Sequence, residues 1–117
     1  MKNGIFLLGL LLTTILTPAV AQERTKAALE KGMNKGITSY LSLLEILTKP
    51  KREGALQAAR DYEYYLTTFP SLTFFEMGLD VARKASDLRA TFQIKAPDAI
   101  QIATAIVHGA TAFLTND

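Results

Sequence analysis

The fold is decided by two segments near the C-terminus, Ile94-Lys95-Ala96-Pro97-Asp98-Ala99-Ile100-Gln101-Ile102-Ala103-Thr104-Ala105 and Ala112-Phe113-Leu114-Thr115-Asn116-Asp117. Pro97 suits the first position of a helix, because the N–H that proline lacks would have no partner there. Asp98 follows in the first turn, where the helix dipole stabilises a negative charge. The first segment is therefore predicted to be a helix that presents a carboxylate at its start.

An apolar stripe and a glycine set the extent of this helix and of the strand after it. Gly109 follows the stripe and suits the left-handed conformation that often ends a helix. Thr111 to Leu114 is short, apolar and compatible with a buried strand. The order helix, glycine, strand predicts a parallel α/β unit, in which helix N-termini and strand C-termini carry the chemistry. The stripe has helical spacing and consists of Ala99, Ile102, Ala103 and Ile106.

The composition limits both the size of the protein and its chemistry. A chain of 117 residues, 49% of them apolar, is enough for one small domain with a packed core. The net charge of +2 does not by itself imply nucleic-acid binding, and the lack of cysteine excludes disulfides, thiolate zinc sites and cysteine nucleophiles. The only histidine, His108, has no second histidine with which to chelate a metal, and it is interpreted as a structural residue in the last turn of the helix.

Residues 1–21 differ in composition from the rest of the chain and are typical of a secretory signal peptide. Lys2 supplies the positive start, Ile5 to Leu16 is the apolar stretch, and Ala19-Val20-Ala21 is a small-residue cleavage site. The stretch is shorter than the roughly 20 apolar residues of a transmembrane helix. The alternative is a buried strand and helix that resemble a signal peptide by chance. The predicted organisation is a leader over residues 1–21 and a domain over residues 22–117.

Helices and short strands follow one another through the middle of the chain. The order after residue 22 is predicted to be α-β-α-α-β-α-α-β. Pro50 is expected to end or kink the second of these helices, and Gly78 is expected to mark a turn. The remaining predicted elements are a helix at Arg24–Lys31, a strand at Ile37–Tyr40, a helix carrying Leu43 to Leu47 and capped by Thr38, Ser39 or Ser42, a helix at Glu53–Thr67, a strand at Leu72–Phe75 and an amphipathic helix at Leu79–Thr91.

Three carboxylates that lie far apart in the sequence form the candidate site: Glu45, Asp98 and Asp117. Taken alone, Glu45 fits the solvent face of an amphipathic helix and Asp98 fits a helix start. Asp117 is the last residue and by itself indicates little. Together they offer the oxygen ligands that hard divalent cations such as Mg²⁺ prefer. Acidic clusters that hold such ions cleave phosphodiesters by orienting water and neutralising charge on the leaving oxygen.

Basic and aromatic side chains could add contacts to a nucleic acid, although each has a simpler explanation. Lysine and arginine contact phosphates, yet a solvated basic surface explains any one of them better. Tyr62, Tyr64 and Tyr65 share one predicted helix and are interpreted as packing or interface residues. The basic residues in question are Lys49, Lys51, Arg52, Arg83, Lys84, Arg89 and Lys95.

Three separated motifs resemble those of PIN domains, and most closely those of the VapC-type toxins of toxin–antitoxin systems. Ala96 to Ala105 and Gly109 to Asp117 resemble the third and fourth acidic motifs. Ile37 to Leu47 resembles the second motif, which carries the family's glutamate, and Leu79 to Phe92 resembles the helix before the third motif. The resemblance covers roughly residues 27–117, with the motifs in the family's order and spacing.

The resemblance implies a three-layer αβα fold around a mostly parallel sheet and a Mg²⁺- or Mn²⁺-dependent endoribonuclease activity. It gives Glu45, Asp98 and Asp117 the catalytic and metal-binding roles. Thr115 and Asn116 fit the polar residues beside the last aspartate. It also implies an RNA substrate, a homodimer, a cognate antitoxin and a place in the cytoplasm.

The chain departs from the family pattern at both ends. The family opens with an apolar strand ending in Asp-Thr-Asn or Asp-Ser-Asn, and this aspartate is a principal metal ligand. Residues 1–22 contain no acidic residue, and even a strand at Gly4 to Leu8 would put Gly9-Leu10 where the aspartate belongs. The chain ends at Asp117, where the family continues into a last helix and strand. The expected fold is incomplete at the N-terminus, truncated at the C-terminus and left with exposed sheet edges, and the metal is expected to bind weakly.

Three functional hypotheses are open from the sequence. In the first, the chain is a divalent-metal ribonuclease toxin. In the second, it keeps the fold but cleaves nothing, and at most it contacts an antitoxin or RNA. In the third, it is a small secreted or periplasmic protein that uses the leader. Export conflicts with a toxin that acts on cellular RNA, and three ordered motifs carry more weight than one apolar stretch. We therefore expect a PIN-like toxin with weak or absent activity, whose first residues reflect a shifted reading frame or a gene fusion.

Overall fold

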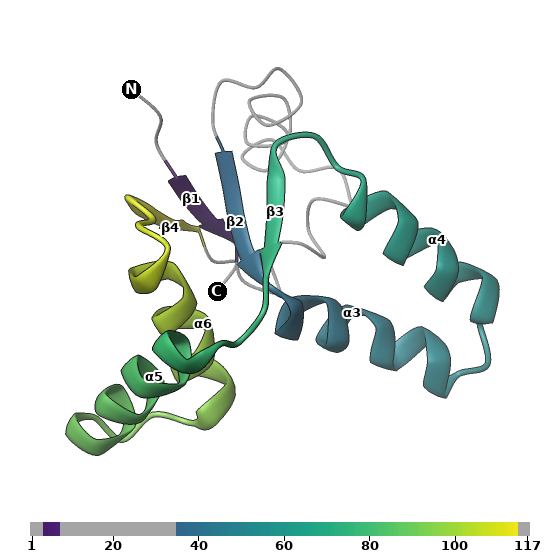
Figure 1. The fold of residues 1–117 in the computed structure, drawn as a ribbon. Coiled ribbons are helices and arrows are strands. Elements are labelled where there is room, and N and C mark those ends of the chain that lie inside the picture. The colour runs from purple at the N-terminus through teal and green to yellow at the C-terminus, as the bar shows by residue number, and fades with distance from the viewer. Residues whose placement is uncertain (1–3, 8–34, 115–117) are drawn as a thin grey trace.

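The computed structural model describes residues 4–7 and 35–114, which form a mixed α/β fold (Figure 1). The strands are β1 (Gly4–Leu7), β2 (Lys35–Ser39), β3 (Leu72–Phe75) and β4 (Ala112–Leu114). The helices are α3 (Tyr40–Arg52), α4 (Leu56–Thr67), α5 (Leu79–Thr91) and α6 (Ala96–Val107).

The strands form one parallel sheet in the order β3-β2-β1-β4. β2 pairs with β3 so that Ile37 lies opposite Thr73 and Ser39 lies opposite Phe75. On its other edge β2 pairs with β1, where Phe6 lies opposite Ile37. Because all the strands run in the same direction, their carboxyl ends lie at one edge of the sheet, which is where parallel α/β folds place their sites.

Helices cover both faces of this sheet, with α3 and α4 on one side and α5 and α6 on the other (Figure 1). Phe74 packs against the cluster of Ile46 and Leu66, which lie on α3 and α4. Phe75 packs against the cluster that contains Ala105 of α6. Neighbouring residues of a strand point to opposite faces, so the sheet has an apolar layer on each side. The arrangement is the predicted three-layer αβα fold.

The buried face of α6 differs from the predicted stripe. Ala99 and Ala103 are buried against α5, as expected, but Ile106 is 48% exposed. Gln101 and Thr104 are buried instead. The predicted stripe is therefore wrong at Gln101, Thr104 and Ile106. The helix α6 packs against α5 along one side and against the sheet along another, so its buried face is wider than a single row of apolar residues.

The predicted order of elements is confirmed throughout the part of the chain that the structure describes. The strand Leu72–Phe75 and the helix Leu79–Thr91 have the predicted bounds, and Gly109 has the predicted left-handed conformation, with φ of 73°. Pro50 lies inside α3, in its last turn. The helix continues past the proline and ends at Arg52. The predicted helix at Arg24–Lys31 lies outside the described residues.

Two helices begin at positions that differ from the predictions. α4 begins at Leu56 rather than at Glu53, because Gly54 takes a left-handed conformation with φ of 77° between the two helices. α6 begins at Ala96, one residue before Pro97. A proline is tolerated there because none of the first N–H groups of a helix has a partner within the helix.

β1 corrects the expectation of a sheet left incomplete at the N-terminus. It occupies an inner place between β2 and β4, and it includes Ile5 and Phe6, residue types that favour strands. β1 also lies within residues 1–21, the predicted leader. That leader stays a prediction, since residues 8–34, including the positions directly after β1, lie outside the described part of the chain.

The helices are short. α3 and α5 have 13 residues each, whereas about 20 apolar residues are needed to cross a bilayer. In residues 35–114 no helix has both the length and the apolar character of a membrane span.

Candidate acidic site at the carboxyl edge of the sheet

The first carboxylate of the candidate site, Glu45, is carried by α3, which begins directly at the carboxyl end of β2. Ser39 caps this helix, because its Oγ accepts a hydrogen bond from the backbone N–H of Leu41 at 2.9 Å. Ser42 and Ile46 are buried beneath the helix, while the side chain of Glu45 is exposed. Glu45 therefore lies at the exposed border of the buried face of α3, close to the edge at which β2 ends.

The second carboxylate, Asp98, lies in the first turn of α6 and is also exposed. The N-cap of α6 is Lys95, and no side chain makes a capping hydrogen bond there. Asp98 is thus stabilised by the positive end of the helix dipole without serving as the cap. Its carboxylate stays accessible to a ligand.

Glu45 and Asp98 are brought together by the fold although they lie on helices from different layers. Partial burial raises the pKa of Glu45 above its ordinary value, and the negative charge of Asp98 raises that pKa further. Like charges interact in this way only when they lie near one another. The charge of Asp98 therefore reaches Glu45, while the role of the two carboxylates in a common site stays a prediction.

Behind this pair lies a buried polar network that the sequence analysis did not identify. Gln101 donates a hydrogen bond from Nε2 to the Oγ of Ser42 at 2.9 Å, and Ser42 in turn shares a hydrogen bond of 2.8 Å with the Oγ1 of Thr38. All three side chains are buried. The available signal was a glutamine between the apolar residues Ile100 and Ile102, since such a side chain must find a partner when it is buried.

The third predicted carboxylate, Asp117, lies outside the described residues, as do Thr115 and Asn116. β4 ends at Leu114, at the same edge of the sheet as the end of β2. Within the described residues, no group of three or more histidine, cysteine, aspartate or glutamate side chains could hold a metal ion. The convergence of Asp117 on the other two carboxylates stays a prediction.

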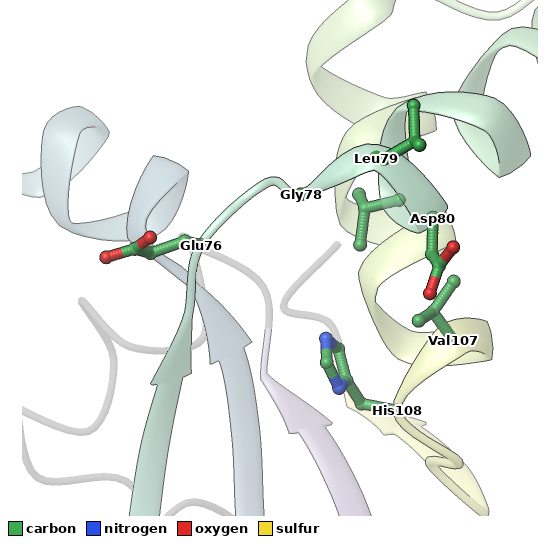
Figure 2. A pocket seen from close by; sticks show the side chains of 7 residues that line it. Glu76, Gly78, Leu79, Asp80, Val107 and His108 are labelled. Carbon is green, nitrogen blue, oxygen red and sulfur yellow. The ribbon is translucent and has the colours of Figure 1, made fainter.

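A pocket of about 210 Å³ lies between the loop before α5 and the end of α6 (Figure 2). Its polar groups come from Glu76, Asp80 and His108, and the Glu76 carboxylate points away from the other labelled side chains (Figure 2). The His108 ring stacks on Phe75, with 3.6 Å between the ring centroids. This packing agrees with the structural role predicted for His108.

An apolar groove of about 260 Å³ lies between the first turns of α3 and α6. Three of the residues beside it expose large apolar surfaces, with exposed fractions of 46% at Tyr40, 61% at Leu44 and 56% at Met77. Ile100 lines the groove from α6. The groove thus adjoins the two helices that carry Glu45 and Asp98.

A three-layer α/β fold with acidic side chains at the carboxyl edge of a parallel sheet defines the class of protein. The model of the PIN domain family matches residues 11–117. This match covers most of the chain, and the chain belongs to the PIN domain family. None of the curated proteins matches the chain.

Solved structures of toxin–antitoxin proteins have the same fold. A toxin–antitoxin complex from Klebsiella pneumoniae has a TM-score of 0.72 at 18% identity, covering 96% of this chain and 86% of that one. VapBC2 from Rickettsia felis, bound to a DNA fragment from its promoter, has a TM-score of 0.78 at 14% identity, covering 97% and 88%. VapC20 from Mycobacterium tuberculosis, a toxin that cleaves the sarcin–ricin loop, has a TM-score of 0.71 at 17% identity, covering 97% and 89%.

Proposed function

We propose that this chain binds a divalent cation, Mg²⁺ or Mn²⁺, with Glu45, Asp98 and Asp117, on the scaffold of a VapC-type endoribonuclease toxin. The observation that carries this proposal is the interaction between Glu45 and Asp98. The fold holds two carboxylates of like charge near each other at the edge where parallel sheets place their sites. A cation held by these carboxylates would relieve their repulsion, and Mg²⁺ commonly takes one or two protein carboxylates together with water and phosphate.

The residues present suit hard metal ions rather than zinc or a thiolate metal. Carboxylate oxygens are the ligands that Mg²⁺ and Mn²⁺ select, and the chain has no cysteine and one histidine. A cation bound there supplies charge neutralisation and an activated water for attack on an RNA phosphodiester. Glu45 and Asp98 would hold the ion, and Thr115 and Asn116 would support Asp117.

We expect any RNA cleavage by this chain to be weak or absent. Active family members use an aspartate after the first strand, and residues 1–22 contain no acidic residue. Fewer carboxylates bind a divalent cation less tightly, because ligand charge sets much of its affinity. The chain then retains the fold and part of the site with reduced chemistry.

The proposed partners follow from the family and from the apolar groove beside Leu44 and Met77. An exposed apolar groove is typical of a surface that binds another protein, and the similar structure from K. pneumoniae is a toxin–antitoxin complex. We assign this chain an antitoxin partner, an RNA substrate, a homodimeric state and a place in the cytoplasm.

The deciding experiment combines metal binding with RNA cleavage on the purified chain. Mn²⁺ binding is measured by electron paramagnetic resonance, and cleavage of a labelled RNA is followed with and without Mg²⁺ or Mn²⁺. The Asp98→Asn variant is compared with Asp80→Asn, which also removes a carboxylate from the first turn of a helix. We expect Mn²⁺ to bind to the wild type and to Asp80→Asn, and to bind much more weakly to Asp98→Asn.

The same experiment separates the alternative functions. Metal binding without cleavage identifies a non-catalytic member of the family, whereas robust cleavage that is lost in Asp98→Asn shows that the missing aspartate is dispensable. Equal Mn²⁺ binding by Asp98→Asn and the wild type contradicts the proposed site. N-terminal sequencing of the expressed protein tests export, because a mature start at Gln22 would show that the leader is used.

A further inference from the structure

We propose that the hydrogen bond between Gln101 and Ser42 sets the separation of the Glu45 and Asp98 carboxylates, so that Gln101 and Ser42 are positioning residues of the acidic site. The importance of this bond for a metal rests on the proposed function. Its effect on the spacing of the two helices does not.

The bond and the carboxylate pair occupy matching places on the same two helices. Glu45 lies three residues after Ser42 on α3, and Asp98 lies three residues before Gln101 on α6. Residues three apart on a helix are neighbours on one face. The buried Ser42–Gln101 bond therefore lies about one helical turn from Glu45 on α3 and about one turn from Asp98 on α6.

A link between these helices is needed because α3 and α6 lie on opposite sides of the sheet (Figure 1) and the side chains of Glu45 and Asp98 are both exposed. Packing does not hold an exposed side chain at a fixed spacing, whereas Mg²⁺ demands nearly ideal octahedral geometry. The Gln101–Ser42 bond can supply the constraint, since it joins side chains that are only 4% and 0% exposed.

The network also connects the Gln101–Ser42 hydrogen bond to β2, an inner strand of the sheet. Thr38 belongs to β2, and its Oγ1 lies 2.8 Å from the Oγ of Ser42. Because Ser42 accepts a hydrogen bond from Gln101, its own hydroxyl hydrogen is available for Thr38. The position of α6 is thus coupled through two buried hydrogen bonds to an inner strand, which is the most constrained part of a parallel sheet.

Gln101 retains a polar group that the core does not need for stability. Its Oε1 is buried, and no donor within the described residues reaches it. An unsatisfied buried acceptor is unfavourable, so stability alone favours an apolar side chain at this position. Thr104, on the same helix, provides the contrast, because its buried hydroxyl donates a hydrogen bond to the carbonyl of Ile100 in its own helix.

The test compares variants that remove the Gln101–Ser42 hydrogen bond with variants that keep it. Gln101→Met keeps the length of the side chain and removes both polar atoms, and Ser42→Ala removes the acceptor. Ser42→Thr retains a hydroxyl and is the conservative rescue, while Thr104→Val removes a buried hydroxyl that plays no part in this bond. Thermal denaturation curves are recorded first, and all further measurements are made at a temperature at which every variant is folded.

Two readouts are taken, one with metal and one without. For Mn²⁺ affinity, we expect about tenfold weaker binding in Gln101→Met and Ser42→Ala, the lower end of the loss seen when a supporting residue of a metal site is removed. We expect near wild-type affinity in Ser42→Thr and Thr104→Val. The second readout is crosslinking, which is possible because the chain has no native cysteine. In a double variant that carries Glu45→Cys and Asp98→Cys, a short thiol crosslinker reports how closely the two positions approach.

We expect Gln101→Met and Ser42→Ala to lose most of this crosslinking, and Thr104→Val to keep it. Unchanged crosslinking in both of the first two variants overturns the inference, whatever the metal does. If the wild type binds no Mn²⁺ but the crosslinking still depends on Gln101, the metal proposal fails and the positioning role stands.

Discussion

Glu45 on α3 and Asp98 on α6 lie close enough for their carboxylates to interact, although they come from helices on opposite faces of the sheet. Partial burial is the larger cause that holds the pKa of Glu45 above its ordinary value, and the charge of Asp98 is the second. Both causes disfavour a charged Glu45, and the attraction of a bound cation would offset them. The pair thus provides a direct way to test the site in the absence of any activity.

The first prediction concerns the charge of Asp98. In Asp98→Asn the repulsion is removed while the burial remains, so the pKa of Glu45 should fall but should stay above its ordinary value. Carboxyl-carbon NMR titration of wild type and variant measures this directly. Asp80→Asn is the control and should leave the pKa of Glu45 unchanged. An identical Glu45 pKa in wild type and Asp98→Asn would show that the two carboxylates do not interact in solution.

The second prediction follows from proton linkage. A carboxylic acid whose pKa is raised by folding binds more protons in the folded state than in the unfolded state, so its contribution to stability falls as the pH rises above its ordinary pKa of 4.5 towards the folded value. Glu45→Gln removes this decline. We expect its stability relative to the wild type to increase with pH through this window and then to level off. Urea denaturation at a series of pH values measures it, with Glu63→Gln on the exposed face of α4 as the control.

The fold could be predicted from the sequence largely because its signals are local. Strand Leu72–Phe75 lies between turn residues, and helix Leu79–Thr91 has one apolar face, so chemistry within a few residues sets both bounds. The failures come from contacts between distant segments. Ile106 continues the apolar row of α6 but is exposed, because the neighbours of α6 decide which face is buried.

The site was only partly predictable for the same reason. Glu45 and Asp98 could be proposed because carboxylates in these motifs have a recognisable pattern, and the charge of Asp98 raises the pKa of Glu45. The Ser42–Gln101 bond could not be deduced, since 59 residues separate its partners and either side chain alone fits an ordinary helix position. Polar side chains that serve a site from within the core carry no periodic signal.

The third prediction tests the core between α3, α4 and β3. Leu66 is fully buried beside Ile46 and Phe69. Leu66→Ala should lower the free energy of unfolding by about 2–5 kcal/mol, through lost burial and the cavity left behind. Leu56→Ala, at a position of the same helix that is 54% exposed, should change it by less than about 0.5 kcal/mol. Equal losses in the two variants, measured by denaturant unfolding, would contradict the packing of α4.

The fourth prediction concerns the start of α3. Ser39→Ala removes the oxygen that accepts a hydrogen bond from the backbone N–H of Leu41, and we expect a loss of about 1 kcal/mol in unfolding free energy. Ser86→Ala is the matched control, because the hydroxyl of Ser86 bonds back to Arg83 within α5 and caps nothing. That change should be neutral or slightly stabilising, since alanine favours helices. A loss at Ser86 as large as that at Ser39 would assign the effect to serine removal in general.

The last prediction links metal binding to stability. A cation that binds only the folded chain raises the free energy of unfolding by about 2.7 kcal/mol when its concentration is a hundred times its dissociation constant. We therefore expect Mn²⁺ to raise the unfolding temperature of the wild type, and to have little effect on Glu45→Gln or Asp98→Asn. Glu63→Gln and Asp80→Asn should keep the full increase, because they remove carboxylates from outside the pair. If all four variants gain as much as the wild type, the stabilising ion binds elsewhere, and the proximity of Glu45 and Asp98 has another cause.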